Sequence, residues 1–479
     1  MCRSYLIIVF LLILSNCAVF AQSPDHYDTL TYDDYMNGKW KELVVHAKEA
    51  ESNNSLSTYS QKRLGYAYFM LKDYNASIYY YSQILDSNNT DADAQTMLYL
   101  NYLNNGNATQ MNRIRGFMST ELESYLKLPS WKFLESIYTE GGYTYSNNFK
   151  ENDNLDLYAN PHLFGAQKLT GDMSSEQIGL KFYPSHSVSI YLAYKNFNIS
   201  FKQRYGATIL SLTGTTLYHP PNGGSPYMRN NYASRDTIFS EKFKTIQSEY
   251  YANACIAFKN GNFTPFFHLI NQNSGYIATP FHDSLYQIQP INFQDTIQRI
   301  YSFSVQNNTS TSFVAGISLA KQFGNFLLES NLSLSNFEAM SQKQVGASVT
   351  YYLLGNSHFF ITPQFKYLSD SLNNNFITQV NVTIMLHKFC WLTAYGSNGD
   401  LDHSNEQLGL VVFNNGDIFK HRYGATLCFP FSRMVTVYLD AQIIQSQSWI
   451  FKLPDLMHPG YFWSNYQNEC ITIGLKYNL

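Results

Sequence analysis

Long apolar runs are missing from most of this 479-residue chain. A helix that crosses a bilayer needs about 20 consecutive apolar residues, and no such run follows residue 21. Charged residues are also scarce, at 14% of the chain, whereas ordinary soluble proteins contain about 25%. The formal net charge is −3. We therefore expect no nucleic-acid partner, because binding to phosphates requires a basic surface.

The sequence also lacks the common motifs of catalysis and cofactor binding. It contains no G-x-S-x-G, no H-E-x-x-H, no P-loop and no dinucleotide fingerprint. Cys255, Cys390, Cys428 and Cys470 are far apart, a spacing that predicts neither a disulfide framework nor a zinc site. Asp400-Leu401-Asp402-His403 brings two carboxylates near an imidazole, but it falls in a predicted outer loop, where such residues form turns. We predict no catalytic residue, no metal, no cofactor and no enzymatic activity.

Aromatic residues are abundant instead, at 16% of the chain, with 39 Tyr and 34 Phe. Little charge, many aromatics and no spanning apolar run are the composition of a transmembrane β-barrel. In such a barrel, lipid-facing and lumen-facing residues alternate along each strand.

Residues 1–21 have the features of a secretory signal peptide. Arg3 supplies a positive start, Leu6 to Leu14 form a short apolar core, and Ala21 ends a segment suited to cleavage. A lipoprotein signal at Cys17 is the alternative, although Asn16 replaces the small residue that normally precedes such a cysteine. We expect export from the cytoplasm and removal of residues 1–21.

Residues 22–130 form the second predicted region, in which the sequence repeats with the 34-residue tetratricopeptide period. In the clearest unit, 58–91, Leu64-Gly65 and the later aromatic Tyr81 match that repeat. Each unit is a helix pair that buries its apolar face only by stacking on a neighbour. We therefore predict an all-α domain of tetratricopeptide-like repeats.

The aromatic residues of these repeats suggest a binding surface. Tyr59, Tyr66 and Phe69 are candidates for contacts with a periplasmic protein or polymer. The alternative is that these rings pack between helices and only stabilise the repeats.

From about Ser136 onward the hydrophobic period changes to two. In the segment 434–443, Val435, Val437 and Leu439 share one face, and polar side chains occupy the other. Strict alternation over eight to ten residues is typical of transmembrane β-strands. About fourteen such strands begin near residues 136, 175, 187, 245, 261, 309, 325, 340, 357, 374, 389, 419, 433 and 467.

The connections between these strands support the same architecture, because every second one is short. The others include long connections near 149–174, 206–244, 274–308, 398–418 and 448–466. Short periplasmic turns and long external loops are typical of outer-membrane barrels. We predict that residues 131–479 form an antiparallel transmembrane β-barrel of about 14 strands in the cell outer membrane. The repeats then lie in the periplasm.

Several ionisable residues fall on the predicted inner face of this barrel. Unpaired charges are very costly in a dry interior, so the lumen is either wet or cross-linked by ion pairs. The lumen candidates are Lys181, Lys195, Glu249, His268, Glu329, Lys366, Asp440 and Lys476.

The order of signal, repeats and barrel resembles the YaiO-like outer-membrane proteins of Bacteroidetes-type bacteria. The resemblance is best in 248–271 and 420–440, and the alternating C-terminal segment 469–479 is similar to the signal read by the barrel-assembly machinery. The same order is similar to that of exopolysaccharide export porins, which carry many more repeats. These resemblances imply a barrel in contact with outer-membrane lipid. They further imply a pore or export conduit whose repeats recruit a partner or cargo.

Two other functions remain open at this point. One is a non-conducting surface protein whose long loops bind an external ligand. The other is a barrel enzyme that acts on lipids.

Overall fold

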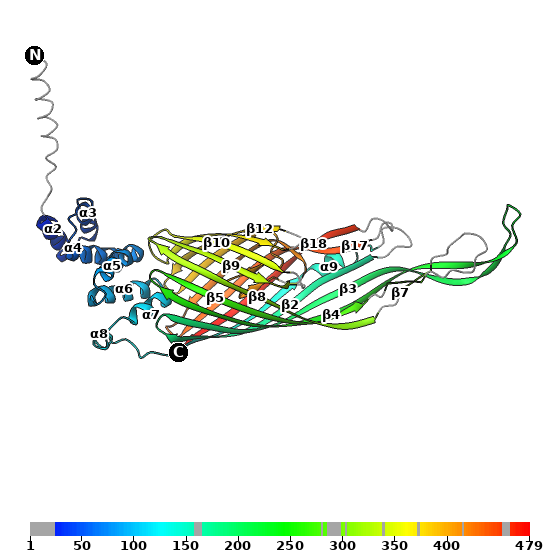
Figure 1. The fold of residues 1–479 in the computed structure, drawn as a ribbon, viewed down its shortest axis with the longest axis horizontal. Helices are drawn as coiled ribbons and strands as arrows, with labels where there is room; N and C mark the ends of the chain where they lie inside the picture. Colours follow the sequence, from blue (N-terminus) through cyan, green and yellow to red (C-terminus); the bar gives the residue numbers. More distant parts are fainter. Residues whose placement is uncertain are drawn as a thin grey trace, which may run out of the picture.

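The structure is a computed structural model that describes most of the chain (Figure 1). The predicted signal peptide, residues 1–21, lies outside the described residues. The described ranges are 24–157, 165–278, 281–284, 298–301, 304–337, 341–370, 374–413, 416–452 and 460–479.

In the described part of the chain, three consecutive helix pairs and one further helix precede the barrel. The pairs begin at Pro24, Thr58 and Ala92 and are therefore spaced by the predicted period. No helix in the described part of the chain is long and apolar enough to cross a membrane. The helices are α2 (Pro24–Met36), α3 (Trp40–Ser52), α4 (Thr58–Met70), α5 (Tyr74–Ser87), α6 (Ala92–Asn104), α7 (Ala108–Arg115) and α8 (Thr120–Tyr125).

The repeat residues noted in the sequence explain how α4 packs on α5. A Cβ atom on Gly65 would lie 2.7 Å from the ring of Tyr81, so only glycine permits this approach. Ser77 Oγ donates a hydrogen bond to the Gly65 carbonyl at 2.7 Å. Leu64 is completely buried between the helices. Gly65 and Tyr81 therefore fit each other where α4 packs on α5.

Fourteen antiparallel strands form the closed barrel, as the sequence predicts. β1 closes it by pairing with β18, from Ser136↔Asn478 to Ser146↔Asn468. The barrel strands are β1 (Leu134–Ser146), β2 (Gly165–Ser185), β3 (Val188–Tyr218), β4 (Tyr227–Phe258), β5 (Gly261–Ala278), β8 (Ser304–Phe323), β9 (Phe326–Ser335), β10 (Gln342–Tyr352), β11 (Phe359–Ser369), β12 (Asn374–His387), β13 (Cys390–Asn398), β16 (Ile418–Pro430), β17 (Val435–Lys452) and β18 (Gly460–Asn478).

The two faces of the wall differ in chemistry as the alternation predicts. Along β9, Leu328, Leu332 and Leu334 are exposed on the outside, whereas Ser333 is buried inside. Short elements lie in the connections: α9 (Asn148–Asn152), β6 (Phe281–Ser284), β7 (Gln298–Tyr301), β14 (Asn405–Glu406) and β15 (Val411–Val412).

Several predicted loops are strand for much of their length, and the largest correction concerns 206–244. There β3 and β4 continue as a two-stranded ribbon, with paired residues from Gly206↔Ile238 to Tyr218↔Tyr227. The ribbon projects well beyond the end of the barrel (Figure 1). The prediction failed here because alternation is enforced only where one face meets lipid, and a ribbon outside the bilayer need not alternate.

The helices dock against the short turns of the barrel. Asn75 donates its backbone N–H to the Gly355 carbonyl at 2.9 Å. Gln110 Nε2 donates to the carbonyls of Phe258 and Gly261 at 2.9 and 2.7 Å. Gly355 has a φ of 66°, and a Cβ atom there would overlap Asp73. The helical domain is therefore held at the short-turn mouth of the barrel, opposite the ribbon (Figure 1).

Candidate functional site

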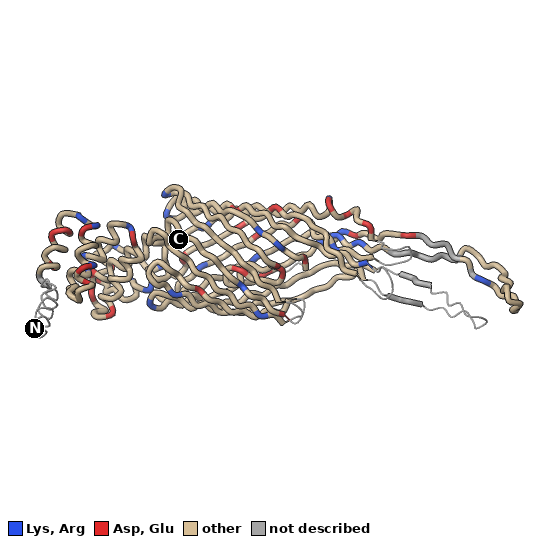
Figure 2. Tube along the Cα trace, turned by 90° about the horizontal axis from the view of Figure 1, so that it is seen from above, with Lys and Arg blue, Asp and Glu red and all other residues tan. Residues whose placement is uncertain are grey.

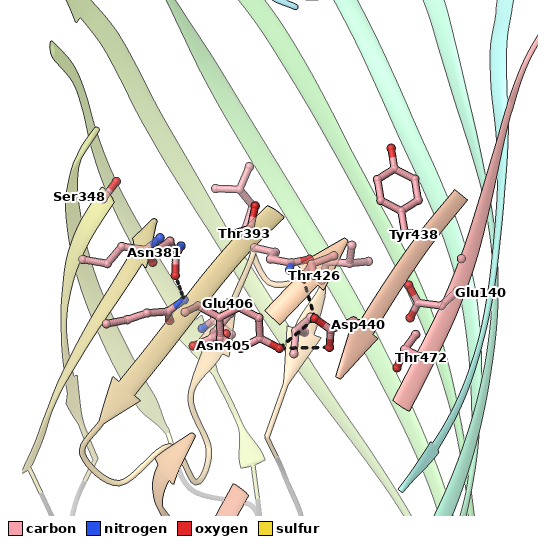
Figure 3. A pocket seen from close by; sticks show the side chains of 18 of the residues that line it. Glu140, Ser348, Asn381, Thr393, Asn405, Glu406, Thr426, Tyr438, Asp440 and Thr472 are labelled. Carbon is pink, nitrogen blue, oxygen red and sulfur yellow. Dashed lines mark hydrogen bonds between the residues drawn. The ribbon is translucent and has the colours of Figure 1, made fainter. Parts of the chain in front are cut away.

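The connection between β13 and β16 folds into the barrel. Its residues Leu401 and Ser404 are completely buried, and Asn405 is almost so. Within it, β14 and β15 pair as a short hairpin, Asn405↔Val412 and Glu406↔Val411. We call residues 399–413 the lumen loop; Figure 3 shows its Asn405 and Glu406 among side chains of the barrel wall. Part of this segment is thus a buried element and not an outer loop as predicted.

Glu406 anchors the lumen loop by two ion pairs. Its Oε1 accepts from Lys366 Nζ on β11 at 2.9 Å, and its Oε2 accepts from Arg422 Nη2 on β16 at 2.7 Å. All three side chains are less than a tenth exposed. Removing one member of such a buried group leaves the others uncompensated, at a cost of about 3–5 kcal/mol. Glu406 therefore fixes the loop between two strands that are not sequence neighbours.

On the far side of the lumen the wall binds the backbone carbonyls of the loop. Lys195 Nζ on β3 donates to Leu410 O at 3.1 Å, and Tyr251 on β4 donates its hydroxyl to Leu408 O at 3.0 Å. His268 Nδ1 on β5 lies 2.6 Å from Gly409 O. Since these strands lie across the ring from β16, the loop crosses the lumen.

A second contact fixes the hairpin against β10. Gln344 Nε2 donates to Asn405 O, and Gln344 Oε1 accepts from the Asn405 backbone N–H, both at 3.0 Å. Asn405 Nδ2 also donates to Ser333 Oγ on β9 at 2.9 Å. This reciprocal pair satisfies buried backbone groups that would otherwise be costly.

The central cavity, of about 730 Å³, lies between the lumen loop and the short-turn mouth. Most of its lining residues are polar, and several of its charged side chains are bonded to neighbours. Asp440 Oδ1, for example, accepts from Tyr395 at 3.0 Å and from Thr426 at 2.6 Å (Figure 3). Lys181 Nζ pairs with Glu135 Oε2 at 3.0 Å. The chamber therefore presents charges of both signs, of which Lys181 is in an ion pair and Asp440 is hydrogen-bonded to hydroxyl groups.

A second cavity, of about 230 Å³, lies nearer the ribbon end of the barrel. We call it the loop-side cavity. It shares part of its lining with the central cavity, so the two chambers adjoin at the edge of the lumen loop. The shared residues are Glu140, Gln177, Lys195, Val411, Arg422, Gln442 and Thr472.

A third cavity, of about 200 Å³, lies between the helical domain and the barrel turns. Tyr102 and Gln110 contribute from the helices, and Glu329 and Leu408 from the barrel and the lumen loop. Glu329 and Leu408 also line the central cavity. The spaces in the lumen thus extend from the ribbon side to the foot of the helical domain.

The structure places the predicted lumen residues inside the barrel. Glu249 lines the loop-side cavity, and His268 is completely buried with its Nε2 3.1 Å from Glu249 Oε2. The remaining candidates line the central cavity: Lys181, Lys195, Glu329, Lys366, Asp440 and Lys476.

The three aromatic candidates in the repeats have different surroundings. Tyr59 is 70% exposed. The Tyr66 ring packs against Tyr35 and Trp40, with centroids 5.4 and 5.5 Å away, and Phe69 lies beside Tyr74 at 5.7 Å. Tyr66 and Phe69 thus pack against neighbouring rings, which is the alternative considered from the sequence, and Tyr59 is exposed.

Sequence reasoning missed Glu406 and Arg422, the central ion pair of the lumen loop. One signal was available: the run 408–413, Leu-Gly-Leu-Val-Val-Phe, is too apolar for an external loop. Leu408, Leu410 and Val412 pack against a buried cluster of the wall. An apolar run inside a predicted loop thus indicates an inward fold.

No protein-family model and no curated protein matches this chain. Similar solved structures include the toluene transporter TodX of P. putida, with 7% identity, a TM-score of 0.38, and coverage of 72% of this chain and 90% of TodX. A FadL homologue of Pseudomonas aeruginosa has 10% identity, a TM-score of 0.31 and coverage of 72% and 90%.

The ferric-catecholate import receptor Fiu of E. coli K12 is also similar, with 9% identity and a TM-score of 0.30. The match covers 65% of this chain and 53% of Fiu, so the chain spans about half the length of that receptor. Like those for TodX and the FadL homologue, these values are too low to assign the chain to a family.

Proposed function

We propose that this chain is an outer-membrane conduit that the lumen loop holds closed at rest. The observation that carries the proposal is the placement of that loop across the lumen, with cavities on both sides of it. If the lumen loop left the lumen, the cavities on its two sides would join into one continuous space. The ion pairs of Glu406 are polar contacts that water can replace, so they suit an element that leaves and returns.

The orientation follows from the two ends of the barrel. Short turns and the helical domain occupy one end, and the ribbon projects from the other. Outer-membrane barrels keep short turns in the periplasm, so we place the helices there. We further propose that they are tetratricopeptide-type repeats of a YaiO-like protein, and that they recruit a periplasmic protein or polymer to the mouth. The 34-residue spacing of the helix pairs supports this identification.

We assign no catalytic role to the chain. The acids and the imidazole of the lumen are bonded to wall and loop groups, as Glu406, Asp440 and His268 show. This arrangement supports a structural use of these groups.

The test is single-channel conductance of the full mature chain in planar bilayers. The wild-type protein should show a low or intermittent current. Glu406→Gln should increase both conductance and open time, because it weakens the pairs with Lys366 and Arg422. Glu329→Gln is the matched control, since Glu329 lines the same cavity but bonds to Ser318 of the wall.

A variant in which a short Gly-Ser linker replaces residues 402–412 should give the largest steady current. If this variant folds and remains silent, the conduit is excluded. The non-conducting surface role would then take its place. The ribbon of β3 and β4 favours that second candidate, because it extends a two-stranded surface outside the barrel.

A further inference from the structure

Part of the wall of the loop-side cavity is apolar, although the cavity lies in the lumen of a barrel. Such lumens are normally polar because they hold water. Beside polar and charged residues, its lining contains a group of apolar side chains from the wall and from the lumen loop. These include Met173, Phe197, Ile199, Phe413, Phe419 and Ile444.

The size of this cavity limits what it can hold. An apolar protein cavity of about 150 Å³ accommodates one benzene molecule, and the loop-side cavity measures about 230 Å³. One aromatic ring with a short side chain, or an alkyl group of similar bulk, would fill it. Small-molecule sites typically combine such an apolar chamber with a few placed polar groups.

Lys195 is the polar group that is placed for a ligand. It lies where the two chambers adjoin and is only 8% exposed. Its Nζ donates to Leu410 O at 3.1 Å, and within the described residues it has no other hydrogen-bond acceptor and no ion pair. A buried ammonium group without a counter-ion is costly, so an anion at this point would be stabilising.

Three carboxylates line the same cavity: Glu140 and Glu249 are bonded to other groups, and the side chain of Glu176 is exposed. Glu249, its cross-strand neighbour, accepts from Gln247 at 2.6 Å and lies 3.1 Å from His268. Glu140 accepts from the hydroxyl of Tyr138. Neither forms an ion pair with Lys195, which leaves its charge available to a ligand.

Arg422 adds a second cation to the lining of both chambers. Glu406 and Gln379 accept from its Nη2, whereas its Nε has no partner among the described residues. From these features together, we propose that the loop-side cavity binds an amphipathic anion. The apolar group of the ligand fills the cavity, and its acidic group pairs with Lys195.

This inference names the substrate class of the proposed conduit and rests on that function for its biological meaning. Binding itself does not require current, so the two ideas fail separately. A protein that binds the anion and never conducts would overturn the conduit alone. A protein that conducts and does not bind would overturn this inference alone.

The test uses 3-phenylpropionate as the probe and the full mature chain in lipid nanodiscs. Calorimetric titration, with empty nanodiscs as the blank, should show saturable binding with one site per chain. Lys195→Gln should weaken it at least tenfold, because the variant keeps a donor for Leu410 O and loses the charge. Lys476→Gln is the matched control, since Lys476 lines the central cavity and not the loop-side cavity.

Two further measurements separate the charge from the cavity. The amine 3-phenylpropylamine has the same ring and the opposite charge, and it should bind at least tenfold more weakly than the acid. Ile199→Trp fills the cavity and should abolish binding while the barrel remains folded. Equal binding of acid and amine, unchanged binding by Lys195→Gln, or no binding to the wild type would each overturn the proposal.

Discussion

The helical domain buries apolar residues and the barrel exposes them on its outer face. In the helices, Leu43, Leu64 and Leu98 are buried at the centre of each pair. In the barrel, Leu328 and Leu332 lie on the outside, and Gln344 and Glu406 are buried inside. Figure 2 shows the corresponding charge pattern, with blue and red segments dense on the helices and sparser along the barrel.

The comparison shows that the surrounding solvent determines where a residue belongs. In water, apolar surface is buried because its exposure is unfavourable. In lipid, apolar side chains remain outside, and polar groups gather where water or other polar groups can meet them. Within this one chain, apolar residues therefore recur with a period near 3.6 in the helices and near 2 in the barrel strands.

The first prediction tests the outer face of the barrel and has the largest expected effect. Leu332→Arg places a charge against lipid near the middle of β9 and should destabilise the barrel by about 2–4 kcal/mol. Asn331→Arg is the neighbouring control, since Asn331 lines the central cavity. Reversible unfolding in vesicles measures both, and equal losses would contradict the assignment of faces.

The second prediction concerns the contact between the two regions. Gly355→Ala should loosen the helical domain from the barrel, because the new Cβ would overlap Asp73. The backbone strain at positive φ costs roughly 1–2 kcal/mol, and the steric overlap adds to it. Amide exchange of Asn75, whose N–H binds Gly355 O, should accelerate.

Gly324→Ala provides the control for this substitution. Gly324 also has a positive φ, of 54°, but nothing lies within 4 Å of its added Cβ. Gly324→Ala should therefore have a similar backbone strain but leave the helical domain docked on the barrel. Matching exchange rates at Asn75 in the two variants would rule out docking through this turn.

The third prediction, with the smallest effect, concerns pH in the helical domain. The hydrogen bonds from Arg115 to Glu123, both 3.0 Å, lower the pKa of that carboxyl from 4.5. A lowered folded-state pKa stabilises the fold above pH 4.5, and this contribution is lost as pH falls through the folded value.

The loss should be below about 1 kcal/mol, because Glu123 is partly exposed and screened by solvent. Helical unfolding measured between pH 6 and pH 3 should show it, and Glu123→Gln should flatten the slope. The variant would lower stability at neutral pH only. An unchanged slope in Glu123→Gln would show that another acid is responsible.

The sequence was most informative where the bilayer imposes alternation. Predicted strand starts at the short-turn end, near 187, 261 and 389, agree with Val188, Gly261 and Cys390. Strand starts predicted at the other end of the barrel lie too far along the sequence. For example, β4 was expected to begin near residue 245 and begins at Tyr227. Beyond the membrane no face is required to be apolar, so the pattern fades although the strand continues.

The candidate site was predictable only in part, for a related physical reason. Alternation along one strand is a local property, and it suffices to predict that Lys366 and Asp440 face the lumen. The lumen loop depends on partners from seven strands, including β3, β4 and β5, which are distant in sequence. No local pattern encodes such a meeting of segments.

The ribbon of β3 and β4 has a consequence for how the protein is made. In the orientation that we propose, the ribbon from Gly206 to Ile238 lies on the outer side of the membrane, so this polypeptide has to cross the membrane during assembly. The lumen loop crosses the lumen of the finished barrel. We therefore expect the ribbon to cross before the lumen loop inserts. The pairing of β1 with β18 closes the wall.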